Sequence, residues 1–341
     1  MSSHKHLGIY FSDDMTWHKH IDYVTAKASQ KIGQMYRSAI YLDRQKLSSV
    51  YLTMIRPILE YGSILFDNCT AGDSMRLEKI QRRAALICTG AMRRTESSKL
   101  LTLLGWPSLE SRRKLNKLLM FFKIAKNLTP LYLSENVQCK LHPPHTLRGY
   151  TKLIEFNIPR TRLTCYQNSF FPSVIKEWNA LPEDITNSTS INMFKVHLMQ
   201  YHKYKIKINV CPMFDASYGY YGKLLTQMML GVSKLNYHLF VYNITDNPFC
   251  PKCFDSVENN NHFFFECVAY SNFRVEMMDS IMTLLHKYNI VVNTNSDDNI
   301  NDIIFNGLTL DKIKHEQFSI NRQLFDIVKW YVKSTCRFCK I

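Results

Sequence analysis

The sequence predicts a mainly α fold, in which a helical bundle is followed by an irregular linker and a small α+β tail. Three observations predict this order. Apolar residues recur at helical spacing through most of the first 128 residues. Four prolines without such periodicity follow between positions 129 and 165, and three cysteines and a histidine then cluster within residues 250–267.

The first 70 residues are expected to form one strand and two helices. The apolar sequence LGIYF at 7–11 predicts a short strand. Apolar stripes predict a helix from His20 to Ile40 and a second from Arg44 to Asp67. Pro57 should kink or divide the second helix, because proline lacks the backbone N–H and its ring crowds the preceding turn.

Two further helices and a linker complete the first half of the chain. Periodic apolar positions predict a helix at 74–90, which Gly90 can stop, and another at 108–127, which begins at Ser108. The proline-containing stretch at 129–165 is expected to be a linker or an irregular loop packed on the helices.

The second half carries weaker periodicity. We expect a short helix within SFFPSVIKEWNALPEDI (169–185), a helix at 191–208, a polar loop at 286–300 and a last helix near 319–334. The chain then divides into five predicted segments: 1–70 with the first strand and helices, 71–128 as a basic helical region, 129–190 as the linker with the SFFP…WNALP sequence, 191–285 as the cysteine- and histidine-bearing domain, and 286–341 as a loop and terminal helix.

The chain is strongly basic. Its 341 residues contain 43 Lys and Arg against 28 Asp and Glu, which gives a net charge of +15. This balance favours a polyanionic partner, and a solvated basic surface without a partner is the alternative. No apolar run approaches the ~20 residues of a membrane span and no secretion signal is visible. We therefore expect no membrane partner, a location in the nucleus or cytoplasm rather than secretion, and ten cysteines that are reduced or bind metal.

One motif has the spacing of a metal site, C-x2-C-x8-H-x4-C, formed by Cys250, Cys253, His262 and Cys267. A two-residue gap lets one turn of backbone aim two thiolates at one ion, and three thiolates with one imidazole leave no open position for water. The motif therefore predicts structural zinc, with buried free cysteines and a surface histidine as the alternative. A second pair, Cys336 and Cys339, lacks a partner half and is not assigned to a metal.

Positive charge is concentrated in residues 75–126, which hold 13 Lys and Arg and three acids, hence 13 − 3 = +10. Such a patch would grip phosphate oxygens without distinguishing bases, and guanidinium groups suit phosphates because they bond them in a bidentate way. The alternative for each residue is an ordinary solvated charge. The predicted phosphate-binding residues are Arg82, Arg83, Arg93, Arg94, Arg112, Arg113 and Lys114.

Aromatic residues gather around the cysteine motif, at Phe249, Phe254, Phe263, Phe264 and Phe265. They could stack on unpaired bases. The interpretation we favour is that several of them form a small core around the ion.

The sequence FSDD at 11–14 is similar to the turn that reverse-transcriptase-type polymerases use to hold two magnesium ions. That chemistry needs a third carboxylate on a neighbouring upstream strand. Only ten residues precede Phe11 and none is acidic. Asp13 and Asp14 are therefore expected to be turn residues that help to cap the helix starting near Trp17.

Five stretches in order resemble the C-terminal part of a non-LTR retrotransposon reverse transcriptase of the Jockey-like group. LGIYFSDDMTWHKHI (7–21) is similar to the segment after the catalytic palm. IRPILEYGSILFDN (55–68) and RLEKIQRRAALICTG (76–90) resemble the thumb and the basic helix after it. The SFFP…WNALP sequence resembles a phrase of the same family, and MLGVSKLNYHLF (229–240) resembles the approach to its zinc-binding tail.

The resemblance implies a thumb-like bundle and a zinc tail that bind RNA or an RNA–DNA hybrid. The family's endonuclease and palm would lie upstream of Met1, so the resemblance implies descent from an RNA-directed DNA polymerase without its activity. Magnesium would be needed only if a palm were supplied elsewhere. Three alternatives stay open: a zinc-stabilised protein-interaction module, a mobile-element relic with no selected role, and an active polymerase or nuclease using Asp13 and Asp14.

Overall fold

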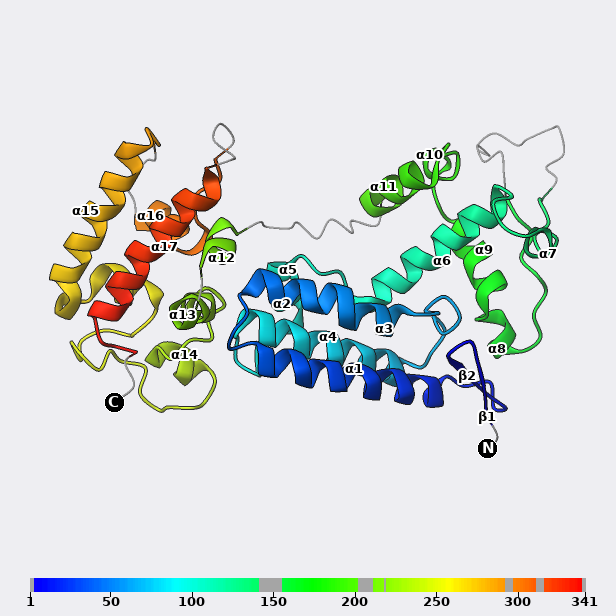
Figure 1. Cartoon of the computed structure of the whole chain (residues 1–341), viewed down its shortest axis with the longest axis horizontal. Coiled ribbons are helices and arrows are strands. Elements are labelled where there is room, and N and C mark those ends of the chain that lie inside the picture. Colours follow the sequence, from blue (N-terminus) through cyan, green and yellow to red (C-terminus); the bar gives the residue numbers. More distant parts are fainter. Residues whose placement is uncertain are drawn as a thin grey trace. The chain divides into compact units, whose positions relative to one another are not determined.

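The chain is mainly helical in the computed structural model (Figure 1). It forms two compact units: the first comprises Met1–Gln34, Tyr51–Arg83 and Gly105–Ile208, and the second comprises Met35–Val50, Ala84–Leu104 and Asn209–Ile341. The five-segment division made along the sequence stays a prediction. The residues that the structure describes are 3–140, 155–201, 211–217, 219–291, 297–310 and 316–338.

The first unit opens with a β-hairpin. Strand β1 (Ser3–His6) pairs antiparallel with β2 (Ile9–Ser12). Leu7 and Gly8 join them with φ values of 46° and 84°. Two successive positive φ values are typical of the tight turns that match strand twist. The strand predicted at 7–11 is found at Ile9–Ser12, so the prediction began two residues too early. Its polar partner β1 was not predicted, because it carries no apolar alternation.

Helices α1 (His18–Ser38) and α4 (Ala71–Thr89) lie side by side over the parts that belong to the first unit, and each ends in the second. The residue numbers of the contacting pairs rise together along the two helices, so the helices run parallel. The contacts are His18 Nδ1 with Asp73 Oδ2 at 2.6 Å, the ion pair of Asp22 with Arg76, and Ser29 with Arg83 at 3.5 Å. The helices predicted at 20–40 and 74–90 are confirmed, and Gly90 ends α4 with a φ of 68°.

The helix predicted from Arg44 to Asp67 is divided, as Pro57 indicated. It consists of α2 (Arg44–Val50), a π-helical turn η1 (Tyr51–Ile55) and α3 (Arg56–Glu60), in which Pro57 occupies the first turn. A first-turn proline loses no helical hydrogen bond, because the N–H there has no partner within the helix. The prediction was too long, since Tyr61 turns to extended backbone and Gly62 follows with a φ of 67°.

An aromatic core holds the rest of the first unit together. Phe121 contacts Trp178 with 5.1 Å between ring centroids, and Phe122 stacks on Phe194 at 4.6 Å. Ser108 caps its helix as predicted, because its side chain accepts from the backbone N–H of Ser111. The helices of this part are α6 (Leu109–Ala125), α7 (Leu131–Ser134), α8 (Thr164–Gln167), α9 (Phe170–Asn179), α10 (Glu183–Thr186) and α11 (Ile191–Tyr201).

The second unit is built around packed helices α15 (Ser271–Lys287) and α17 (Gln317–Ser334), whose buried faces carry Ile281, Leu284, Leu324 and Val328. The terminal helix predicted near 319–334 is confirmed. The other elements are α5 (Ser97–Leu104), α12 (Pro212–Ala216), α13 (Gly219–Met229), α14 (Asn236–Val241), the π-turn η2 (His262–Glu266), the 3-10 turn η3 (Val268–Tyr270) and α16 (Asp297–Asn306).

Three predictions for this unit need correction. The tail was expected to be α+β, but its only β pairing among the described residues is an isolated bridge between Phe249 and Val257. The loop predicted at 286–300 is too long, because α16 already begins at Asp297. Helix α5 was not predicted, since its eight residues are too few for a clear period. The helix predicted at 191–208 is found as α11 as far as Tyr201. Its remaining part, 202–208, and Cys339 lie outside the described residues.

Candidate metal centre and basic surface

The first half of the motif is a tight turn. The bridge between Phe249 and Val257 closes a short hairpin, and inside it the Cys250 N–H donates to the Ser256 carbonyl at 2.8 Å. The Phe254 N–H donates back to the Cys250 carbonyl at 3.0 Å, and Phe254 has a φ of 63°. The turn places Cys250 and Cys253 on one side, as the two-residue spacing predicted.

The second half uses a π-turn. The Asn259 side chain accepts from the His262 N–H at 2.8 Å and so starts the turn η2. The Cys267 N–H then donates to the His262 carbonyl at 2.8 Å and closes it. A hydrogen bond between residues five apart sets the x4 spacing, because it returns Cys267 to the side on which His262 lies.

The four candidate ligand side chains converge, and two of the distances between them match a tetrahedral zinc site. Their ligand atoms all lie within 4.8 Å of one another. Cys250 Sγ is 3.8 Å from Cys267 Sγ, and Cys253 Sγ is 3.4 Å from His262 Nε2. Zinc bonds of about 2.3 Å to sulfur and about 2.0 Å to nitrogen place two sulfurs about 3.8 Å apart and a sulfur and a nitrogen about 3.5 Å apart. The cluster can therefore hold a metal ion. His262 is 3% exposed, so the surface histidine of the alternative interpretation is not found.

The environment of the thiols favours a bound cation. Burial raises the pKa of Cys267 to about 12, and the neighbouring Cys250 adds to the effect. Burial also opposes ionisation of Cys253, but backbone N–H groups of Asp255 and Ser256 outweigh it and lower the pKa of that thiol. Three thiolates crowded in one place repel one another, and a divalent cation bound between them removes that penalty.

The aromatic residues around the motif divide into two sets. Phe263 and Phe264 are completely buried and belong to the core that also contains Cys250 and Cys267, whereas Phe265 is half-buried. Phe249 and Phe254 are exposed, at 46% and 76%. The favoured expectation of a small core around the ion holds for the first set only.

Two of the predicted phosphate-binding residues are engaged inside the first unit. Arg113 is 2% exposed; its guanidinium donates to Ser74 Oγ at 2.7 Å and lies 3.9 Å from Asp67. Arg112 makes a bidentate pair with Glu60. Lys114 is exposed but pairs with Glu110 at 2.7 Å. Arg112 and Arg113 therefore fit a phosphate-binding role poorly, because each would have to leave a carboxylate.

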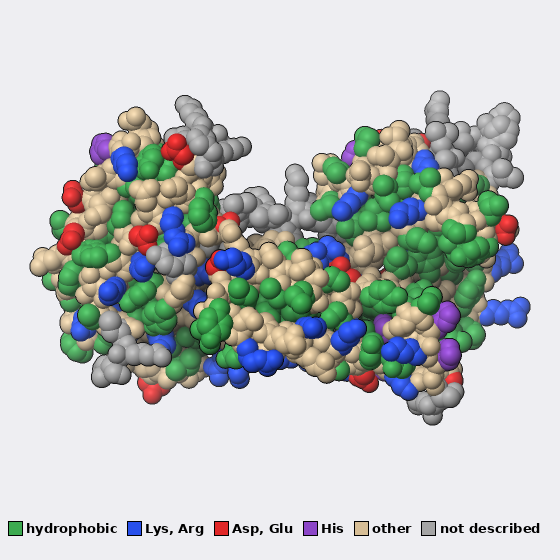
Figure 2. All heavy atoms as spheres, in the orientation of Figure 1, with side chains coloured by type: hydrophobic (Ala, Val, Ile, Leu, Met, Phe, Trp, Pro, Cys, Tyr) green, Lys and Arg blue, Asp and Glu red, His purple; other side chains and the backbone are tan. Residues whose placement is uncertain are grey.

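The other predicted arginines are more open to solvent. Arg83, on α4 in the first unit, is exposed, and Arg82 is partly exposed. Arg93 and Arg94, in the second unit, are exposed, and Arg94 donates to the Tyr242 carbonyl at 2.7 Å. Figure 2 shows Lys and Arg side chains along the visible face of the helices α1 to α4, interleaved with hydrophobic ones. An exposed cationic surface is thus present, but it contains fewer of the predicted residues than the count of charges in the sequence indicated.

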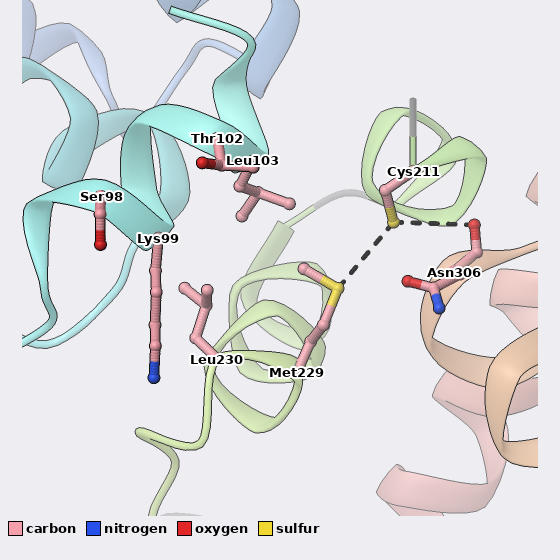
Figure 3. A pocket seen from close by; sticks show the side chains of 8 residues that line it. All are labelled: Ser98, Lys99, Thr102, Leu103, Cys211, Met229, Leu230 and Asn306. Atoms are coloured by element: carbon pink, nitrogen blue, oxygen red, sulfur yellow. Dashed lines mark hydrogen bonds between the residues drawn. The ribbon is translucent and has the colours of Figure 1, made fainter. Parts of the chain in front are cut away.

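The second unit also contains a pocket of about 400 Å³ that the sequence did not indicate (Figure 3). Ser98, Lys99 and Thr102 of α5 form its polar side, and Met229 and Leu230 form an apolar side. The Cys211 thiol also lines the pocket, and it contacts the Phe305 carbonyl at 3.3 Å and Met229 Sδ at 3.9 Å. The Cys211 thiol therefore already has contacts within the protein.

Among the residues that the structure describes, no third ligand gathers with Asp13 and Asp14 in the way that a polymerase metal site needs. The Asp14 carboxylate accepts from the Thr16 N–H at 3.0 Å and from the Thr16 hydroxyl, which lowers its pKa. The expected turn is confirmed. Asp14 closes the turn before α1 rather than capping the helix itself, because α1 begins two residues beyond Thr16.

No protein-family model, curated protein or solved structure matches this chain. The described helices include none that is both long and apolar enough to cross a bilayer.

A buried histidine near the candidate metal centre provides a pH-dependent prediction. His238 is 7% exposed, and its Nδ1 lies 2.8 Å from Ser233 Oγ. Burial lowers the pKa of His238 from 6.5 to about 4. The folded state keeps the ring neutral while the unfolded chain takes up a proton below pH 6.5, so stability is complete above that pH and is lost as the pH falls toward 4.

We expect this histidine to lower the free energy of unfolding of the second unit by about 2 kcal/mol between pH 7 and pH 5, since each pKa unit is about 1.4 kcal/mol. Urea titrations at the two pH values measure it. The variant His238→Asn, whose side chain can still accept from Ser233, should show a smaller loss. His286→Asn, which removes an exposed histidine of α15, should behave as the wild type. Equal pH slopes for both variants would refute the assignment.

Proposed function

We propose that this chain is a zinc-stabilised nucleic-acid-binding protein related to the C-terminal part of non-LTR retrotransposon reverse transcriptases. The single observation that supports it most is the convergence of Cys250, Cys253, His262 and Cys267, whose ligand atoms all lie within 4.8 Å of one another. The proposal assigns binding to this chain and no catalysis. Magnesium enters only with a palm domain supplied by another polypeptide.

The proposed ion is zinc, in a structural role. Three thiolates and one imidazole satisfy a tetrahedral ion completely, so no position is left for a reacting water. The His262 Nδ1 lies 3.8 Å from Glu266 Oε2, where a small adjustment would give the carboxylate contact that metal-bound imidazoles commonly make. When bound, zinc would supply the cross-link between the hairpin of Cys250 and the π-turn of His262.

The proposed polyanion is RNA or an RNA–DNA hybrid, held through phosphate contacts. Exposed arginines occur in each unit separately, Arg83 in the first and Arg93 in the second. Such contacts depend on counterion release and carry no sequence information. The exposed rings of Phe249 and Phe254 add faces on which unpaired bases can stack.

Salt dependence tests the polyanion proposal. Binding of a labelled RNA–DNA hybrid should weaken steeply between roughly 50 and 200 mM salt. The logarithm of the affinity should fall linearly with the logarithm of the salt concentration, with a slope of roughly 0.7–0.9 for each phosphate contacted. Arg83→Gln should reduce that slope by about one contact, or ~0.9. Fluorescence anisotropy at several salt concentrations measures both quantities.

The matched control is Lys176→Gln, which removes an exposed cation from α9 of the same unit. It should leave the slope nearly unchanged, because it lies outside the proposed arginine set. A wild-type affinity that does not respond to salt, or equal effects of the two variants, would contradict the proposal.

A protein-interaction module is the second candidate, and one observation favours it. Helix α14 and the loop after it expose Tyr237, Phe240, Val241 and Ile244 by 41–56%. Contiguous exposed apolar side chains are typical of protein contacts. Affinity capture after nuclease treatment separates the two candidates, because only a protein partner survives it.

A further inference from the structure

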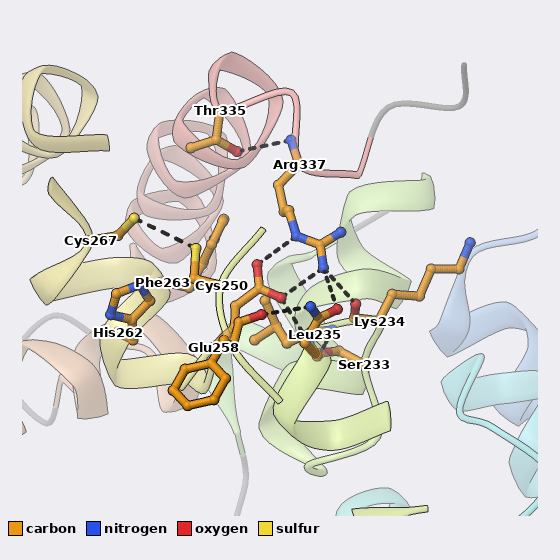
Figure 4. Close-up of polar contacts among 12 residues, drawn as sticks. Ser233, Lys234, Leu235, Cys250, Glu258, His262, Phe263, Cys267, Thr335 and Arg337 are labelled. Atoms are coloured by element: carbon orange, nitrogen blue, oxygen red, sulfur yellow. Dashed lines mark hydrogen bonds and ion pairs between the residues drawn. The ribbon is translucent and has the colours of Figure 1, made fainter. Parts of the chain in front are cut away.

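A buried ion pair connects the candidate metal loop to the C-terminal end of the chain (Figure 4). Glu258 is 0% exposed. Its carboxylate accepts from Arg337 Nε at 2.5 Å and Nη2 at 2.7 Å, and from the Asn236 N–H at 2.7 Å. A carboxylate is retained in a protein interior only when its charge and its hydrogen bonds are satisfied. Here both conditions are met.

Glu258 stands between the two pairs of candidate metal ligands. Its N–H donates to the Pro248 carbonyl at 2.9 Å, next to the turn that carries Cys250. The following residue, Asn259, holds the N–H of His262. The carboxylate therefore fixes the stretch of chain on which the separation of the two ligand pairs depends.

The C-terminal residues contact the same loop at two more places. The Tyr331 hydroxyl donates to the Phe263 carbonyl at 2.5 Å, directly after His262. The Phe338 ring meets the Phe263 ring edge to face, with centroids 5.5 Å apart, and is 7% exposed. Arg337 also donates to the Lys234 carbonyl at 3.2 Å. Three residues near the end of the chain thus hold both sides of the metal loop, none of them a metal ligand.

We propose that Tyr331, Arg337 and Phe338 form a C-terminal clasp that retains the metal ion by holding the loop closed. This inference depends on the proposed zinc site. Release of the ion requires the hairpin and the π-turn to separate, and the clasp opposes that separation through Glu258 and Phe263. The coupling is reciprocal, so a bound ion also holds the clasp in place.

The rate of zinc release tests the clasp. In the zinc-loaded full chain, Glu258→Gln keeps the shape of the side chain but removes its charge, and Arg337→Met removes the guanidinium. Each should release zinc to an excess of chromophoric chelator about 10-fold faster than the wild type, the scale on which partners of metal ligands act. The double variant breaks the same contact and leaves neither charge uncompensated. It should therefore release zinc at the rate of the single variants.

The matched control is Lys333→Met, which removes an exposed cation from the last turn of α17 and no clasp contact. It should release zinc at the wild-type rate. Hydrogen exchange of the wild type gives a second measurement that needs no variant: amides of 331–338 should exchange faster when zinc is removed.

The outcomes separate the two proposals. A wild-type chain without one equivalent of zinc by elemental analysis overturns the metal centre and the clasp with it. One equivalent of zinc, together with equal release rates for Arg337→Met, the double variant and Lys333→Met, overturns the clasp alone. Unchanged exchange at 331–338 on zinc removal has the same consequence.

Discussion

Replacing Cys250 with serine should abolish stoichiometric zinc binding and destabilise the second unit. The thiolate supplies one of four ligands, and serine cannot replace it because its hydroxyl does not ionise near neutral pH. Structural zinc contributes on the order of 10 kcal/mol to folding in small zinc domains. We expect a smaller loss here, about 3–5 kcal/mol, because Cys250 also lies in an apolar core that remains. Elemental analysis and urea titration measure the two effects.

Cys336→Ser is the matched control for this prediction. Cys336 is an exposed cysteine of the same unit and lies outside the converging set. It should retain one equivalent of zinc and wild-type stability. Equal zinc loss in both variants would show that the pair Cys336 and Cys339 supplies ligands, and retention of zinc by Cys250→Ser would remove the candidate centre.

The candidate metal centre could be predicted from the sequence because its geometry is local. The x2 and x4 spacings correspond to single turns of backbone, and the structure forms both turns with hydrogen bonds inside residues 250–267. Asn259, which starts the second turn, could have been suspected from its position three residues before His262. Glu258 and Arg337 could not, because 79 residues separate the partners of that ion pair.

The extent of the basic surface was overestimated, because it depends on ion pairs between segments that are distant in sequence. Counting charge in 75–126 compares each cation only with acids that are near it in sequence. Three of the acids that pair with α6 lie outside that window: Glu60 pairs with Arg112, and Asp67 and Glu177 pair with Lys117. A run of Lys and Arg on a predicted helix therefore does not distinguish a phosphate-binding face from an internal set of ion pairs. Long helices and their caps were predictable, whereas pairings between segments were not.

Lys117 shows how much stability one of these internal ion pairs carries. It is 3% exposed on α6, and its Nζ lies 2.6 Å from both Asp67 Oδ2 and Glu177 Oε1. Removing one partner of a buried charge network leaves the others uncompensated, which costs about 3–5 kcal/mol. Lys117→Met preserves most of the side-chain volume, so we expect a loss near the lower end, about 3 kcal/mol, measured by urea titration.

Lys114→Met provides the contrast within the same helix. Lys114 is exposed and pairs with Glu110 four residues before it, a pair that contributes about 0.3–0.5 kcal/mol. A double change, Lys117→Met with Asp67→Asn, should recover part of the loss, because one of the two stranded carboxylates becomes neutral. If Lys117→Met and Lys114→Met cost the same, the carboxylates around Lys117 are solvated, and the basic residues of α6 are again available to a polyanion.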